Sequence, residues 1–177
     1  SSEMIHTPGD QADVLVAMNP AALKASLRYL RNNGSVIVNT DSFTSRNLKL
    51  AGFEDNPLET NYLEGYQVIS VEMSRLTKEA LVDVELSHKE TERCKNFFAL
   101  GMVFWMYSRT LDNTLDWIKQ KFSGKPVWME ANSLALKAGR NFADSTEVFP
   151  ASYRVPQAKI EQGIYRQITG NEALSIG

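Results

Sequence analysis

The most regular pattern of apolar and polar residues lies in the first quarter of the chain. Residues 14–17 (Val-Leu-Val-Ala) and 36–38 (Val-Ile-Val) are short apolar runs, which predict two strands buried on both faces. Between them Leu23, Leu27 and Leu30 recur at helical spacing, while the charged side chains point elsewhere. A strand–helix–strand unit of this kind almost always crosses over right-handed into a parallel sheet.

Both ends of this expected helix carry recognisable signals. Asn19 suits the N-cap, and Pro20 suits the first helical position because its missing N–H would be unpaired there anyway. Asn33 and Gly34 are expected to end the helix, since glycine accepts the left-handed conformation of a C-cap. The helix should therefore fill nearly all of the segment between the two strands.

The rest of the chain changes from alternating strands and helices to helices alone. We expect a short helix within residues 45–54 and a third strand at 66–71, followed by helices over 76–81, 89–109, 110–122 and 127–142, with a helical start at 171–174. Thr110 is the preferred opening residue of the 110–122 helix, and Asp112 is the alternative. Residues 82–86 alternate as a strand would and stay ambiguous. The sequence thus predicts an α/β fold with a Rossmann-like parallel sheet, followed by a helical half.

The helix at residues 89–109 is apolar nearly all round, which indicates burial in a domain or an interface. Gly101 in its middle costs helix stability, so we expect it to allow close approach by another backbone. Asn96 stands at the start of the apolar face. A buried Asn there must find partners for its amide, either in a neighbouring loop or in a ligand.

Polar residues follow the first two predicted strands, where α/β sheets usually bind ligands. They are Asn19 and Pro20 after the first strand, and Asn39 and Thr40 after the second. One interpretation is turn and capping chemistry alone. The other is that both loops, with Asn96, line a crevice facing a ligand or another subunit.

Composition narrows the possible functions of the 177-residue chain. A hydrophobic content of 43% supports a real core, and a net charge of −2 weighs against nucleic acid as the main partner. No apolar run is long enough to cross a bilayer, and the start is not that of a secretory signal. The single cysteine, Cys94, fits a reducing setting, so the cytoplasm is expected.

No catalytic or metal-binding motif is present. The chain has no G-x-S-x-G elbow, no Walker phosphate loop and no G-x-G-x-x-G. A single cysteine, Cys94, excludes an internal disulfide or a cysteine-ligated cluster within this chain. His6 is expected in a surface turn, and His88 at a solvated helix start beside Glu90. We therefore predict no catalytic residue and no metal ligand here.

Several segments, in order, resemble one known family. These are ADVLVAMNPAAL, GSVIVNTDSF, CKNFFALGMVFWM, NSLALKAG and, near the end, YRQITGNEAL. Together they resemble the gamma domain of 2-oxoacid:ferredoxin (acceptor) oxidoreductases, in alpha subunits of the 2-oxoglutarate type. The resemblance implies a gamma-type domain over residues 1–145 that lacks its glycine-rich opening segment. Residues 146–177 would then be a linker and the start of a pyrimidine-binding domain.

The resemblance also implies an activity for the whole enzyme. Such enzymes oxidatively decarboxylate a 2-oxoacid, here expected to be 2-oxoglutarate, pass electrons through an iron–sulfur cluster to ferredoxin and form an acyl-CoA. They use thiamine diphosphate with Mg²⁺, and coenzyme A. The resemblance implies that this segment binds none of these cofactors, acts in structure and assembly, and contacts the pyrimidine-binding domain and a beta subunit carrying thiamine diphosphate. It implies cavity or interface contacts for Asn19, Pro20, Asn39, Thr40 and Asn96.

An alternative from another class is a free-standing α/β interaction module that binds a nucleotide-like ligand or a protein. The absence of a glycine-rich phosphate loop disfavours nucleotide binding by this chain. A sheet without its opening strand would also expose an unpaired edge, so self-association of the isolated chain is expected.

Overall fold

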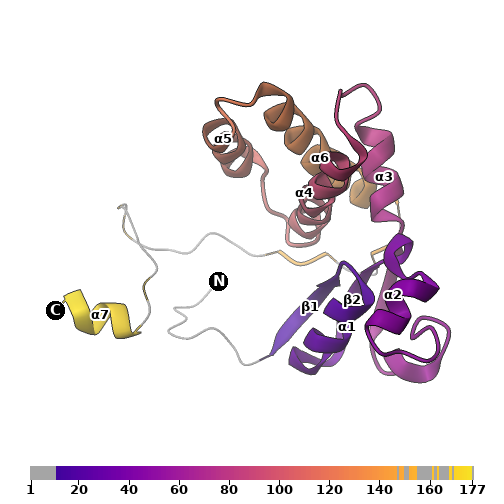
Figure 1. Ribbon diagram of the computed structural model, residues 1–177. Coiled ribbons are helices and arrows are strands. Elements are labelled where there is room, and N and C mark those ends of the chain that lie inside the picture. Colours follow the sequence, from indigo (N-terminus) through magenta and orange to yellow (C-terminus); the bar gives the residue numbers. More distant parts are fainter. Residues whose placement is uncertain are drawn as a thin grey trace.

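A three-stranded sheet and a group of helices form the two main parts of the molecule (Figure 1). The computed structural model describes residues 11–146, 148–149, 152–154, 161, 163, 168 and 170–176. The strands are β1 (Ala12–Ala17), β2 (Leu30–Asn39) and β3 (Gln67–Val71). The α-helices are α1 (Pro20–Ser26), α2 (Ser45–Leu50), α3 (Met73–Ala80), α4 (His88–Met106), α5 (Asp112–Lys121), α6 (Pro126–Ser145) and α7 (Gly170–Ile176). Single 3₁₀ turns occupy Leu27–Tyr29, Thr40–Ser42 and Asn61–Leu63.

The predicted parallel sheet is confirmed, in the order β1-β2-β3. Successive β2 side chains alternate between its two faces, as the period of a strand requires. Val36 and Val38 pack with Leu23 of α1 and Leu48 of α2. Ile37 lies in the other core, together with residues of β3, α4 and α6. The sheet is therefore covered on both faces, which is why its central strand reads as an uninterrupted apolar run.

The first helix is shorter than predicted, and the glycine C-cap is wrong. α1 ends at Ser26, and a 3₁₀ turn leads straight into β2 at Leu30, which is buried. Gly34 lies inside β2, and Asn33 rather than the glycine takes the left-handed conformation, with φ of 61°. Between the pairs Ala12↔Leu30 and Val14↔Ser35, β2 uses extra residues that bulge out of the ladder. Asn33 and Gly34 therefore shape a bulge.

The remaining elements are confirmed, with shifted ends. The predicted 45–54 helix ends at Leu50, where Ala51 and Gly52 (φ 71°) turn the chain. α3 begins at Met73, α4 at His88 and α6 at Pro126. The ambiguous segment 82–86 forms a turn and an extended stretch without strand pairing. Helix α7 contains the predicted helical start at 171–174.

Helices α4 and α6 make the most extensive contact between the described elements, and two glycines permit their close approach. A Cβ added at Gly101 would lie 2.1 Å from the carbonyl oxygen of Leu136, and one at Gly139 would lie 1.9 Å from that of Phe98. Both distances are far below contact, so only glycine fits at either position. The expectation that Gly101 admits another backbone is confirmed.

The chain beyond α6 packs back onto the core. Phe149 is 7% exposed, with its ring 5.5 Å from that of Trp105, and the Tyr153 ring stacks on Tyr107 at 5.4 Å. Helix α6 does end at Ser145, where the domain boundary is expected. The division at residue 145 stays a prediction, and the first residues after it share the core of the segment before it.

Candidate functional site

A surface hollow of about 520 Å³ lies where β1 and β2 end. We call it the strand-end hollow. It is lined by Met18, Asn19, Pro20, Ala21, Ser42, Asn47, Leu50, Ala51, Lys95 and Asn96. These residues come from the β1–α1 junction, from the segment after β2 with α2, and from α4. Three predicted site residues, Asn19, Pro20 and Asn96, therefore meet in one place.

Asn19 and Pro20 form the start of α1, as predicted. The Asn19 side-chain oxygen accepts a hydrogen bond from the Ala22 amide at 2.8 Å, and Pro20 is the first helical residue. Within the described part of the chain, the Asn19 side-chain nitrogen has no hydrogen-bond acceptor. The capping interpretation is confirmed, and the side-chain NH₂ group of Asn19 can still donate a hydrogen bond.

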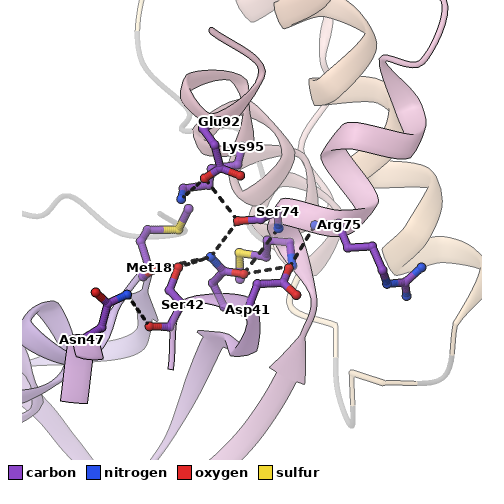
Figure 2. Close-up of polar contacts among 10 residues, drawn as sticks. Met18, Asp41, Ser42, Asn47, Ser74, Arg75, Glu92 and Lys95 are labelled. Carbon is purple, nitrogen blue, oxygen red and sulfur yellow. Dashed lines mark hydrogen bonds and ion pairs between the residues drawn. The ribbon is translucent and has the colours of Figure 1, made fainter. Parts of the chain in front are cut away.

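Asn39 is fully buried, and its amide bonds to Met18, Ser42 and Ser74, which belong to three segments and are labelled in Figure 2. Its oxygen accepts from the backbone N–H groups of Met73 at 3.0 Å and Ser74 at 3.4 Å. Its nitrogen donates to the Ser42 hydroxyl at 2.8 Å, with longer contacts to the Met18 carbonyl and the Ser74 hydroxyl. The side chain thus satisfies the open N-terminus of α3.

The two residues after Asn39 differ in what they do. Asp41 continues the capping of α3, because its carboxylate accepts from the Arg75 N–H at 2.9 Å. Thr40 begins the 3₁₀ turn and is half-buried, outside the lining of the strand-end hollow. Neither Asn39 nor Thr40 therefore reaches the hollow surface directly. The cap of α3 is thus supplied from the end of β2 and the turn after it.

Asn96 differs from its expected environment. The sequence places it at the edge of the apolar face of α4, but its side chain is exposed at the rim of the strand-end hollow. The question of how a buried Asn96 finds partners therefore does not arise. Its neighbour Lys95 also lines the hollow, and the sequence reasoning missed it. The spacing of three residues to Glu92 indicates an ion pair on α4 but gives no signal that Lys95 lies in the hollow.

Lys95 is the positively charged residue among those that line the hollow, and its ammonium forms an ion pair with Glu92. Its ammonium lies 2.7 Å from a Glu92 carboxylate oxygen, and the two side chains are 20% and 34% exposed. The Ser74 hydroxyl donates to the same oxygen at 3.4 Å. Figure 2 shows the contacts from Ser74 through Glu92 to Lys95, and Ser74 in turn accepts a hydrogen bond from the Asn39 nitrogen at 3.3 Å. The lysine position is thus tied to the end of the central strand.

Cys94, Glu90 and His88, the residues that could act as nucleophile, acid or base, lie in or beside the first turns of α4. Cys94 is buried, and this burial, together with the charge of Glu90, raises the pKa of its thiol to about 11. Ser87 and Glu90 form a capping box at the start of α4, and the hydrogen bonds from Ser87 lower the pKa of Glu90. His88 is exposed in this first turn, as predicted. In the described ranges no three His, Cys, Asp or Glu side chains gather as a metal site would require.

Fold and site together define a class: an α/β domain with a parallel sheet, a helical half and a polar hollow at the strand ends. Residues 1–142 match the family described as pyruvate ferredoxin/flavodoxin oxidoreductase. The chain belongs to this family. The resemblance seen in the sequence to 2-oxoacid:ferredoxin oxidoreductases is thereby confirmed.

Two similar proteins show how much of a whole family member this chain covers. The chain is 50% identical over 173 residues to the 2-oxoglutarate oxidoreductase subunit KorA of Mycobacterium tuberculosis (strain ATCC 25618 / H37Rv), covering 98% of this chain and 26% of that protein. It also resembles a structure of 2-oxoglutarate:ferredoxin oxidoreductase from Magnetococcus marinus with 2-oxoglutarate, coenzyme A and succinyl-CoA bound. That match has a TM-score of 0.62 at 22% identity and covers 89% of this chain and 24% of the other, so it shows a shared fold. The chain spans about a quarter of the length of each.

A membrane-spanning helix is not found in the ranges that the structure describes, since none of their helices is both long and apolar enough.

Proposed function

We propose that this chain is a non-catalytic domain of a 2-oxoacid:ferredoxin oxidoreductase that converts 2-oxoglutarate to an acyl-CoA. The observation that carries the proposal is the 50% identity to a 2-oxoglutarate oxidoreductase subunit across 98% of the chain. The domain then supports chemistry performed elsewhere in the enzyme.

The side chains of the site favour a supporting role. The strand-end hollow offers amides, a hydroxyl and a lysine, without a paired acid and base. Cys94 is buried, and it is the single cysteine of the sequence. An iron–sulfur cluster needs several thiolates, a set that the described residues do not offer. In this proposal the cluster, thiamine diphosphate and Mg²⁺ belong to other parts of the enzyme.

We also propose how the domain sits in the assembly. Asn19, Pro20 and Asn96 face a cavity or a neighbouring domain through the strand-end hollow, while Asn39 shapes the hollow from below; Thr40 remains a candidate for interface contact. The partners proposed are the pyrimidine-binding domain of the same subunit, a beta subunit that carries thiamine diphosphate and, through the complex, ferredoxin. The proposed setting is the cytoplasm.

The test is an activity measurement on the full-length protein that contains this chain, purified together with its partner subunit. We expect reduction of ferredoxin that depends on both 2-oxoglutarate and coenzyme A, with pyruvate a poorer substrate. An assembly that reduces ferredoxin with neither 2-oxoacid would overturn the proposal. The reading frame on both sides of the segment provides a second check, since a pyrimidine-binding domain should follow it.

A further inference from the structure

We infer that the strand-end hollow is an anion-binding site in which Lys95 takes a carboxylate or phosphate oxygen of a small ligand. This inference deepens the proposed function and rests on its assignment of the hollow as a contact surface. It is argued from hydrogen-bonding capacity: side chains of the hollow have donors to spare, while the backbone carbonyls of Met18, Ser42 and Ala51 already accept hydrogen bonds.

The first observation is the incomplete coordination of Lys95. A lysine ammonium carries three N–H donors. In the described part of the chain, the Lys95 ammonium has one acceptor, a Glu92 carboxylate oxygen at 2.7 Å. The side chain is only 20% exposed, so water replaces the missing acceptors less freely than it does at the surface. An anionic oxygen in the hollow would complete this coordination with a charge-assisted hydrogen bond.

The second observation is that spare donors surround Lys95. The Asn19 nitrogen and the Asn96 amide lack acceptors within the described ranges. The Ser42 hydroxyl accepts from Asn39, which leaves its own proton to donate. All of these groups line the same hollow as Lys95.

The third observation is that backbone acceptors of the hollow are engaged. The Met18 carbonyl accepts from the Asn39 amide, and the Ser42 carbonyl accepts from the Asn47 amide at 2.9 Å. The Ala51 carbonyl accepts from the Lys24 ammonium at 3.0 Å. A ligand that offers oxygens therefore finds more partners here than one that offers N–H groups.

Size and wall chemistry describe the rest of the ligand. A volume of about 520 Å³ is much larger than one bare ion and falls in the range of small-molecule sites. Met18, Pro20 and Leu50 give part of the wall an apolar character. The ligand class is therefore an anionic head group, carboxylate or phosphate, on a partly apolar body.

Glu92 is expected to oppose binding, because its carboxylate competes with the ligand for Lys95. Removing the two charges should then have opposite effects. Lys95→Met removes the cation, and Glu92→Gln removes the competitor while keeping an oxygen for Ser74. A merely structural role for this pair would weaken binding in both variants.

The experiment is equilibrium dialysis of the full-length protein with its partner subunit at low ionic strength, with inorganic phosphate and with butyrate as separate probes. We expect Lys95→Met to weaken binding of at least one probe about tenfold or more, the loss typical of one charged hydrogen bond. Glu92→Gln should tighten it. Lys121→Met, the same change on the exposed end of α5, should leave binding unchanged.

Equal affinity in Lys95→Met and wild type for both probes, or weaker binding in Glu92→Gln, would overturn the inference. If Lys95→Met fails to fold, Asn96→Asp at the exposed rim replaces it and should also weaken binding. The probe that depends on Lys95 identifies the head group as phosphate or carboxylate. The binding measurement needs no turnover, so it is independent of the activity test. An inactive enzyme whose binding depends on Lys95 would overturn only the proposed activity. An active enzyme whose binding does not depend on Lys95 would overturn only this inference.

Discussion

Three asparagines of the site, identical as residues, have three different roles because their environments differ. Asn19 caps α1 and keeps a free donor, while Asn39 is buried and holds the start of α3 against the end of β2. Asn96 is exposed at the rim of the strand-end hollow. The sequence identified all three as candidates but could not rank them, since the backbone N–H groups that Asn39 caps lie more than thirty residues away.

The role of Asn39 predicts a large loss of stability on truncation. In Asn39→Ala the N–H groups of Met73 and Ser74 lose their acceptor, and the first of them is buried. We expect a cost of about 2–3 kcal/mol, the range for an unsatisfied buried donor. Asn96→Ala should change stability by less than about 0.5 kcal/mol, as an exposed substitution does. Urea unfolding of both variants measures the difference, and similar losses would contradict it.

Cys94 should be unreactive in the folded protein. Burial and the charge of Glu90 raise the pKa of its thiol, so the folded state keeps it protonated where an ordinary thiol ionises. At about pH 8.5, near the usual thiol pKa, iodoacetamide should label Cys94 in urea and spare it in buffer. Labelling in buffer at the rate of a free thiol would show that the site is open.

At the scale of elements, the sequence predicted the strands and the longer helices but not all of their ends. The periodicity of Leu23, Leu27 and Leu30 continues through residues that the structure divides between α1, a 3₁₀ turn and β2. Leu30 pairs with Ala12 in the sheet, a contact that no local pattern contains. Tertiary pairing decides such boundaries, and it also converts the expected C-cap at Gly34 into part of a bulge.

For the helix pair α4–α6, by contrast, the sequence did contain a local signal, and only part of it was recognised. Gly101 was recognised as a point of close approach, and its partner Gly139 was not. Small residues recur every four positions along α6, at Ala131, Ala135, Gly139 and Ala143, and all four are buried. This stripe marks the face that meets α4.

Gly101→Ala is expected to destabilise the protein strongly, although alanine is the better helix former. The added Cβ would lie 2.1 Å from the Leu136 carbonyl oxygen, which is backbone and cannot rotate away. The helices must separate, at a cost of about 3 kcal/mol, the upper end for overpacking. Gly124→Ala is the control, because nothing lies within 4 Å of a Cβ there. Thermal unfolding should show a lowered Tm for Gly101→Ala alone; equal Tm values would refute the close contact.

At the scale of the whole molecule, the strand-end hollow was only partly predictable. The rule that ligands bind at the carboxyl ends of parallel strands led to Asn19 and Pro20. Lys95 is far from both in sequence and enters the hollow because α4 packs beside the end of the sheet. A single sequence contains no record of that packing, so the charge of the site had to come from the structure.

The sheet also predicts the behaviour of the chain in isolation. Among the strands that the structure describes, β1 and β3 each have one neighbour, and Val68 on β3 is 40% exposed. Open edges with apolar side chains favour pairing with another copy. We expect the mass of the isolated chain in light scattering to rise with concentration, and less so for Val68→Lys. A constant monomer mass would contradict the prediction.

The close approach of α4 and α6 at Gly101 and Gly139 also limits how the two positions can change together. In most helix pairs a larger residue on one side is tolerated when the other side becomes smaller, so the two effects are not additive. Here both positions are already glycine, and each faces the backbone of the other helix. A larger residue at one position therefore cannot be offset by a smaller residue at the other. In a library of all double substitutions, this pair should therefore show no compensating combinations.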